Sequence, residues 1–207
     1  MRLPRRPRRI GARSRLQAKY RGGWVASSIT LLRLTALVHF GCHAAAVAAE
    51  PTWSAAGDGE RLWFLGTLAV IRIPGEASDG RFALIEFLLP HLASPPLHTH
   101  PQDESYLVLD GRLTIQAGAA RFELEAGGTA IVPMGVAHTF RVETDTTRVL
   151  VLSTPAGLER FVRQGSVPAT EPTLPPADTP RPSPEELERI FRAHGQVNVG
   201  PSLGPDD

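Results

Sequence analysis

Short runs of alternating apolar and polar residues, separated by turn sequences, dominate the middle of this chain. Successive side chains of a β-strand point to opposite faces, so such runs predict half-buried strands. Turn signals recur about every 8–12 residues, which is typical of a closed antiparallel barrel and not of a parallel sheet. We therefore predict an all-β fold with strands over Leu62–Ile73, Arg81–Leu89, Ser105–Leu109, Leu113–Ala117, Phe122–Leu124, Ala130–Val132, His138–Glu143 and Arg148–Ser153.

The runs between residues 105 and 132 are expected to form an antiparallel meander. Its turns are placed at Asp110-Gly111, Gly118-Ala119 and Gly127-Gly128. Asp-Gly is a strong hairpin signal, because glycine accepts the positive φ that a tight hairpin turn requires.

Two short helices are predicted after the barrel. The first lies within Pro155–Gly165, and a proline-rich linker follows over Pro168–Pro182. The second begins at Ser183, a natural N-cap, with Pro184 at the first helical position and Glu186 completing a capping box. We expect this second helix to pack on its own barrel or on a partner, and we assign it no chemistry.

The chain divides into three predicted segments: a basic extension over residues 1–55, a barrel over 56–165, and a linker with its helix over 166–207. The extension has two interpretations. It is an export signal, with Ala46-Val47-Ala48 before a cleavage point, or an extension that is not part of the native protein, for example from an upstream start codon. We favour the second interpretation and a cytoplasmic location; the first would make the protein exported.

The distribution of charge separates the extension from the rest. Residues 1–50 contain ten of the 22 Lys and Arg and one of the 21 Asp and Glu, so residues 51–207 carry a net charge of −8. An acidic domain argues against a nucleic-acid-binding surface. Residues 24–49 are interrupted by Arg33, so we expect no stable membrane span, which needs about 20 apolar residues. The single Cys42 excludes an internal disulfide.

Four potential metal ligands lie at the two ends of the central stretch. In His98-Thr99-His100, alternation on a strand projects both imidazoles to one face. Glu104 returns a carboxylate to the same spot from the start of the next strand, and His138 follows the rigid turn Pro133-Met134-Gly135. Three imidazoles and a carboxylate suit one divalent transition metal, which is Fe, Mn, Ni, Co, Cu or Zn. Four ligands leave a position open for chemistry.

A solvated loop over Pro95–Asp103 is the alternative interpretation of these polar residues. It does not explain His138, and a protein core has no reason to bury three imidazoles and a carboxylate together. We therefore favour a metal site, while His91 and His194 are interpreted as surface or packing residues.

The spacing of these residues resembles that of the cupin superfamily. His98-x-His100, Glu104 and Gly111 match the first cupin motif, and Gly127, Pro133-x-Gly135 and His138 match the second. The second motif usually closes with Asn, where this chain has Val142. Residues 62–168, with the tail near Gly195–Pro201, resemble single-domain bacterial cupins of the quercetin 2,3-dioxygenase-like group. The resemblance implies a jelly-roll barrel and, by analogy only, a homodimer.

The same resemblance implies a metal-dependent dioxygenase that cleaves the ring of a flavonol or similar enolisable aromatic small molecule with O₂. His98, His100, Glu104 and His138 would hold the metal, and Glu104 would also accept the substrate's hydroxyl proton. Two other classes stay open: a non-catalytic or sensory cupin that binds a small molecule, and a metal-dependent isomerase, cyclase or lyase that needs no O₂.

The residues around the metal are predicted to be mostly apolar. Alternation turns Tyr106, Val108, Phe140 and Val142 inward and Arg141 and Glu143 outward. Met134 is placed on the turn beside the metal. We assign Tyr106, Met134 and Phe140 to the lining of the substrate pocket, which suits a flat aromatic substrate. The alternative is that these side chains merely fill the core, as in other small barrels.

Overall fold

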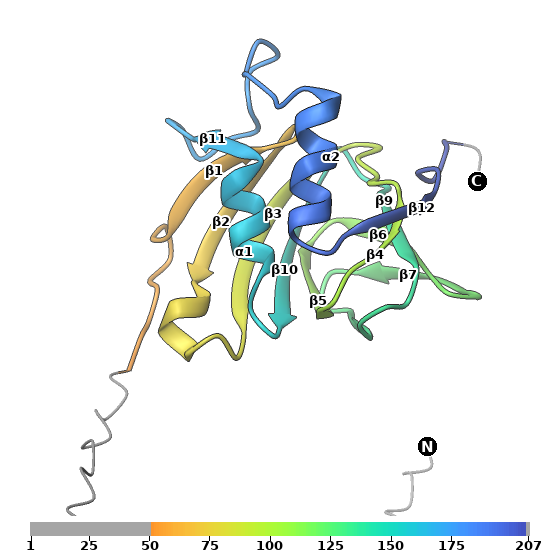
Figure 1. Cartoon of the computed structure of the whole chain (residues 1–207), viewed down its shortest axis with the longest axis horizontal. Coiled ribbons are helices and arrows are strands. Elements are labelled where there is room, and N and C mark those ends of the chain that lie inside the picture. The colour runs from red at the N-terminus through yellow and green to blue at the C-terminus, as the bar shows by residue number, and fades with distance from the viewer. Residues whose placement is uncertain (1–50, 206–207) are drawn as a thin grey trace, which may run out of the picture. The chain divides into compact units, whose positions relative to one another are not determined.

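Two antiparallel sheets face each other across an apolar interior (Figure 1). The computed structural model describes residues 51–205. One sheet has seven strands in the order β11-β1-β2-β3-β10-β5-β8, and the other has five in the order β12-β4-β9-β6-β7. The predicted all-β class with short helices is confirmed. The strands are β1 Glu60–Phe64, β2 Thr67–Ile73, β3 Ala83–Pro90, β4 Leu97–Thr99, β5 Asp103–Asp110, β6 Arg112–Ala117, β7 Ala120–Glu125, β8 Thr129–Val132, β9 His138–Val142, β10 Thr146–Thr154, β11 Ser166–Pro168 and β12 Val197–Gly200.

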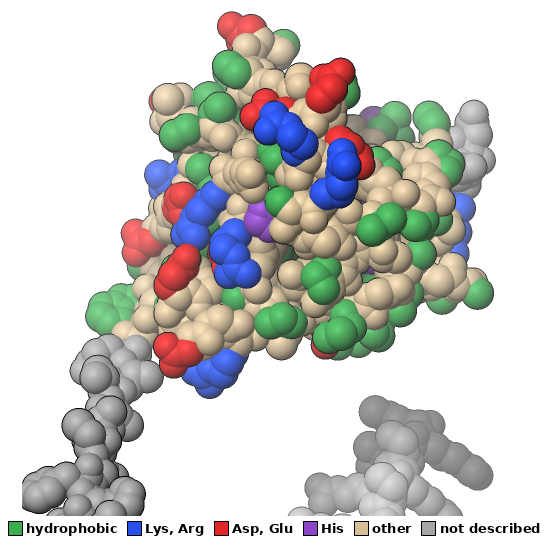
Figure 2. All heavy atoms as spheres, viewed as in Figure 1, with side chains coloured by type: hydrophobic (Ala, Val, Ile, Leu, Met, Phe, Trp, Pro, Cys, Tyr) green, Lys and Arg blue, Asp and Glu red, His purple; other side chains and the backbone are tan. Residues whose placement is uncertain are grey.

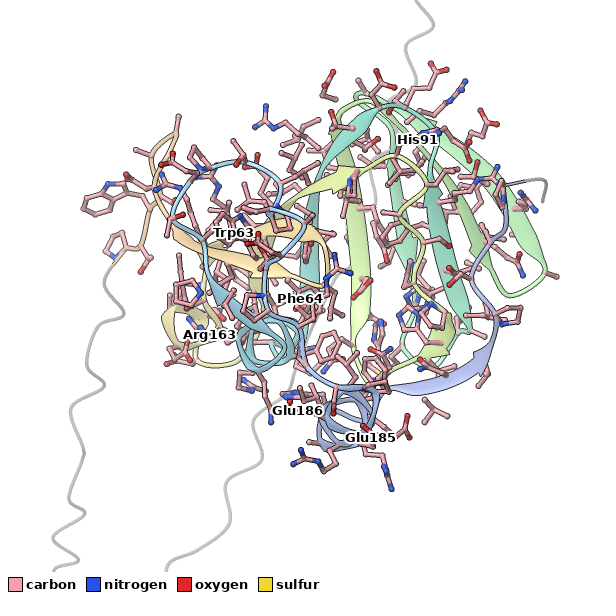
Figure 3. All side chains as sticks on the ribbon, turned by 90° about the horizontal axis from the view of Figure 1, so that it is seen from above. Trp63, Phe64, His91, Arg163, Glu185 and Glu186 are labelled. Atoms are coloured by element: carbon pink, nitrogen blue, oxygen red, sulfur yellow. The ribbon has the colours of Figure 1, made fainter. Side chains whose placement is uncertain are left out.

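The alternation read from the sequence corresponds to the alternation of burial in the barrel. Every second residue of β3 is buried, and β5 buries Glu104, Tyr106 and Val108 in the same way. Both sheets contribute to one core, since Val108 and Val149 of the first contact a cluster that includes Leu113 of the second. Side chains fill the space between the sheets when the barrel is viewed from above (Figure 3).

The first predicted strand is two strands in the structure. β1 and β2 pair as a hairpin, with Trp63 opposite Leu68. Leu65 and Gly66 form the turn with φ of 48° and 94°. The apolar run continues through this turn without a polar residue until Thr67, so its hydrophobic pattern did not reveal the break.

The predicted meander is wrong at two of its three turns. Only β6 and β7 form a hairpin with each other, whereas β5 pairs with β8 and β10 in the opposite sheet. The chain therefore crosses between sheets at Asp110-Gly111 and again at Gly127-Gly128. Gly111 has a φ of +84°, and a Cβ there would lie 2.5 Å from the Thr147 hydroxyl. The corner needs glycine as a hairpin does, but it leads to a different partner strand.

Both helices lie on the described barrel. α1 Leu158–Gln164 contacts β1 and β3, and α2 Pro184–Ala193 contacts α1 (Figure 1). Ser183 caps α2 as predicted, accepting a hydrogen bond from the Glu186 amide at 3.2 Å. Phe161 packs edge-on against Phe64 of β1, 5.3 Å between centroids, and Figure 3 shows Phe64 near α1. Within residues 51–205, no helix is both long and apolar enough to cross a bilayer.

The segment from residue 197 to residue 204 forms the edge strand of the five-stranded sheet and then continues to Arg141 of β9. β12 pairs with β4, the Pro201 carbonyl accepts from the Leu97 amide at 3.0 Å, and the Leu203 amide donates to Ser94. Arg141 donates to the Gly204 carbonyl and is only 7% exposed. Its position on the outer face agrees with the sequence pattern, but this segment buries it.

Charged side chains of both signs are interspersed on the face shown in Figure 2, which includes α1 and α2. Arg163 of α1 forms ion pairs with Glu60 and Glu76, at 2.8 and 3.3 Å. Residues 1–50 of the basic extension lie outside the described part of the chain, so both interpretations of the extension stay predictions.

Candidate metal centre

Three histidines meet between β4 and β9 of the five-stranded sheet. His98 lies directly opposite His138 in the pairing of these strands, and His100 follows the end of β4. One ring nitrogen from each histidine lies within 4.8 Å of the others. Their spacing in the sequence predicted that they lie together, and the structure brings all three into one group.

Glu104 reaches the same group from the seven-stranded sheet. It is the second residue of β5 and is 6% exposed. Its Oε1 lies 3.3 Å from His100 Nε2, and its Oε2 lies 3.6 Å from His138 Nε2. The four side chains that we predicted as ligands therefore converge from both sheets onto one buried point.

Backbone carbonyls set the orientation of two of the rings. His98 Nδ1 lies 2.7 Å from the Pro96 carbonyl, and His138 Nδ1 lies 2.9 Å from the Val136 carbonyl. A carbonyl only accepts, so each Nδ1 carries the proton and donates it, which leaves the Nε2 lone pair free for a metal. His100 differs, because its Nδ1 accepts a long hydrogen bond of 3.4 Å from the Gln102 amide.

Two buried nitrogen atoms in this group have no hydrogen-bond partner among the described residues. They are Nε2 of His100 and Nε2 of His138. Although Glu104 oxygens lie near both, the geometry is not that of a hydrogen bond. An unpaired buried polar atom costs free energy, so such atoms in a native site call for a ligand. The donor set fits a divalent transition metal on this ground.

The electrostatics of the group favour a positive charge at its centre. Burial would raise the pKa of Glu104, but His100 and His138 outweigh it and hold that pKa below its usual value. Burial would lower the pKa of His138, but the negative charge of the neighbouring Glu104 outweighs burial and raises it. Burial, with the charge of His138, lowers the pKa of His98 to about 4. At neutral pH the site thus offers an ionised carboxylate and a neutral His98, the forms that bind metals.

The three residues assigned to the pocket lining differ in their positions. Tyr106 is 5% exposed, and its hydroxyl donates to Glu104 Oε2. Phe140 is partly buried and packs against the core. The side chain of Met134 is 54% exposed, on the turn whose amide donates to Asp103 at 2.7 Å. Burial raises the pKa of Tyr106 well above its usual value, as does the neighbouring Glu104, so the hydroxyl keeps its proton.

Two histidines outside the group have ordinary partners. His91 is exposed and lies 3.2 Å from the Thr144 carbonyl, and Figure 3 shows it at the end of the barrel away from α2. His194 Nε2 lies 2.8 Å from Gln164 Oε1. Both positions agree with the surface or packing role expected from the sequence.

The pairing of β12 with the metal-site strand was not predicted. Asn198 lies opposite His98, so β12 forms the outer neighbour of the strand that carries the first histidine. The alternation Val197-Asn198-Val199 was the available signal, but it covers too few residues to stand out. A hollow of about 470 Å³ lies on the outer face of the seven-stranded sheet, lined by Leu107, Ile131 and Leu150, and is separate from the histidines.

Comparisons with known proteins agree with this arrangement. Residues 85–155, about a third of the chain, match the family model described as Cupin domain. The chain is 30% identical over 95 residues to quercetin 2,3-dioxygenase of Bacillus subtilis (strain 168), covering 45% of this chain and 28% of that protein. It is 41% identical over 56 residues to an uncharacterized protein of Streptomyces coelicolor, covering 27% and 53%. The matches thus span between about a quarter and a half of these relatives' lengths.

Solved structures show weaker likeness. A structure described as an RmlC-like cupin, from Shewanella frigidimarina, is 15% identical to this chain. The match covers 54% of this chain and 98% of that one, with a TM-score of 0.46.

Proposed function

Because this chain carries a cupin domain and is a member of the cupin superfamily, we propose that it is a metal-dependent dioxygenase of a flavonol-like or other enolisable aromatic small molecule. The observation that carries the proposal is the convergence of His98, His100, His138 and Glu104 on one buried point. The 30% identity to a quercetin 2,3-dioxygenase over 95 residues supports the choice of reaction.

Each of the four side chains has a role in this proposal. The three histidines and Glu104 would hold one divalent metal, which when bound supplies Lewis acidity and electron transfer to O₂. Glu104 is ionised at neutral pH and accepts the proton of the substrate's enolic hydroxyl. Phe140 and the apolar barrel wall orient a flat ring and exclude water from it.

The test is anaerobic loading of the purified protein with Fe, Mn, Ni or Co, followed by measurement of O₂ uptake with a panel of flavonols. We expect uptake with at least one metal, and a much slower reaction in Glu104→Gln, which keeps the shape but loses the charge. His91→Ala is a control that should keep the wild-type rate, because His91 is exposed and lies outside the group of three histidines. A lack of turnover with every metal would contradict the proposal.

The same assay separates the alternative functions. Turnover that persists without O₂ would support an isomerase, cyclase or lyase. A rise in melting temperature with a small molecule but without product would support a binding or sensory protein. The homodimer implied by the family resemblance stays a prediction, which light scattering coupled to size-exclusion chromatography tests.

A further inference from the structure

We propose that Tyr106 is a positioning residue for Glu104: its hydroxyl holds Oε2 and so leaves Oε1 as the carboxylate oxygen that faces the metal. This inference deepens the proposed function, because it rests on the metal site formed by the three histidines and Glu104. It assigns Tyr106 a task different from contact with substrate.

The geometry follows from the strand. Glu104 and Tyr106 are two residues apart on β5, so both side chains enter the barrel on the same face. The Tyr106 hydroxyl donates to Glu104 Oε2, while Oε1 lies 3.3 Å from His100 Nε2. Both oxygens lie near an imidazole, since Oε2 is also 3.6 Å from His138 Nε2, but only Oε2 accepts a hydrogen bond from the phenol.

The hydroxyl of Tyr106 is unusual for its surroundings. Tyr106 is 5% exposed and belongs to a core cluster in which its neighbours are apolar, among them Val108, Val132 and Val151. Phenylalanine would fill the same space without placing a polar group in the core, and a buried hydroxyl without a partner costs free energy. The bond to Glu104 is what compensates for that cost here.

The terminal torsion of a glutamate is broad and roughly two-fold, so packing alone does not fix which oxygen points to the metal. A phenol bound to Oε2 removes that freedom and draws electron density toward Oε2. A metal held by the three histidines and Glu104 would then meet Oε1, while Oε2 stays bound to the phenol. Partners of this kind orient a ligand although they do not touch the metal.

The test is the Tyr106→Phe variant loaded anaerobically with Co²⁺ alone, without substrate. We expect the cobalt dissociation constant, measured by chelator competition, to rise about 10–100-fold, the usual effect of losing a hydrogen-bond partner of a metal ligand. We also expect a changed visible absorption spectrum, since the carboxylate is then free to bind through both oxygens. Val108→Ala is the matched control, because it disturbs the next inward position of β5 without touching Glu104; it should lower stability and leave the spectrum unchanged.

A second pair of variants tests whether Tyr106 affects cobalt binding through Glu104. In Glu104→Ala, the further change Tyr106→Phe should alter neither the cobalt affinity nor the spectrum. An equal effect with and without Glu104, or no effect of Tyr106→Phe on cobalt binding in the wild-type background, overturns the inference. Wild-type protein that binds no cobalt overturns the metal site and this inference together. Cobalt binding with the expected variant effects, but no O₂ uptake with any flavonol, overturns the dioxygenase and supports the role of Tyr106.

Discussion

The carbonyl groups of Pro96 and Val136 decide which ring nitrogen His98 and His138 present to the centre of the barrel. Each carbonyl lies within 2.9 Å of an Nδ1 atom. Because each bond uses the residue two positions earlier in the chain, the orientation of these rings is built into the local backbone. The lone pairs are therefore directed inward before a metal arrives.

We expect His138→Ala to lose most of its bound metal. His138 is 2% exposed and is the cross-strand partner of His98, so alanine removes one of the three buried imidazoles of the group. Elemental analysis of the purified protein measures the loss. His91→Ala, which removes an exposed histidine, should keep the wild-type metal content, and equal loss in both variants would refute a specific role for His138.

Gly111 and Gly127 lie at the two corners where the chain crosses between the sheets, with similar backbone angles but different surroundings. Their φ angles are +84° and +86°, but a Cβ at Gly111 would lie 2.6 Å from the Thr146 carbonyl oxygen, whereas one at Gly127 meets nothing within 4 Å. Alanine at Gly127 should cost about 1–2 kcal/mol from the φ angle alone. Gly111→Ala should cost more, about 3–4 kcal/mol, because the clash adds to the strain. Urea unfolding measures both, and equal costs would contradict this explanation.

At the scale of elements, an ion-pair network connects three neighbouring strands of the larger sheet. Glu86 of β3 accepts from Arg72 of β2 and from Arg148 of β10, each at 2.6 Å at its shortest. Burial would raise the pKa of Glu86, but hydrogen bonds from Arg148 and Arg72 outweigh burial and lower it. The folded state therefore binds this proton less readily than the unfolded state.

The sign of the pH dependence follows from that shift. A lowered folded-state pKa contributes stability above the unfolded value, near 4.5, and this contribution is lost as pH falls through the folded pKa. We expect Glu86→Gln to lower the free energy of unfolding by about 1–2 kcal/mol at pH 7, the net contribution of hydrogen bonds to a charged group. Urea unfolding at pH 7 and pH 3 tests this. The difference from wild type should shrink at pH 3, and a constant difference would disprove the linkage.

The elements that could be predicted from the sequence are those marked by neighbouring residues within the element itself. Alternation located β3 and β5, and the capping residue Ser183 located the start of α2. What the sequence could not predict is which strands pair. Asp110-Gly111 provides the same backbone freedom to a hairpin and to a corner between sheets. The difference lies in the pairing of β5 and β6 with strands elsewhere in the chain.

In the candidate site, too, local patterns could be predicted from the sequence and long-range contacts could not. The spacing of His98, His100 and Glu104 sufficed to place them together, because strand alternation is a local rule. Other features of the site depend on side-chain rotamers or on segments far apart in the sequence. They are the carbonyls that accept from the histidines, the bond between Tyr106 and Glu104, and the neighbouring strand β12. These features became visible only in three dimensions.

At the scale of the whole molecule, the metal-site strand depends on a segment about a hundred residues later in the chain. β4 pairs with β9 through the His98–His138 pair and with β12 on its other side. A strand of three residues with few cross-strand partners is weak alone, so the backbone that carries His98 is held in place by β12.

We expect a chain that ends at Gln196 to bind metal more weakly than one that ends at Gly204. The shorter chain loses β12 and the bond from the Leu97 amide to Pro201, so β4 becomes a frayed edge. Competition with a chelator measures the difference, and circular dichroism checks that both chains keep their strands. Unchanged metal affinity in the shorter chain would show that β12 is dispensable.

The late position of β12 also has a consequence for biosynthesis. Strands β1 to β10 emerge from the ribosome before residues 197–200, and until then one edge of β4 is bare. A nascent chain can thus collapse its core while its histidines are still loosely held. The backbone that carries His98 therefore gains its outer partner only after the core strands are in place, so the histidines reach their final positions late in folding.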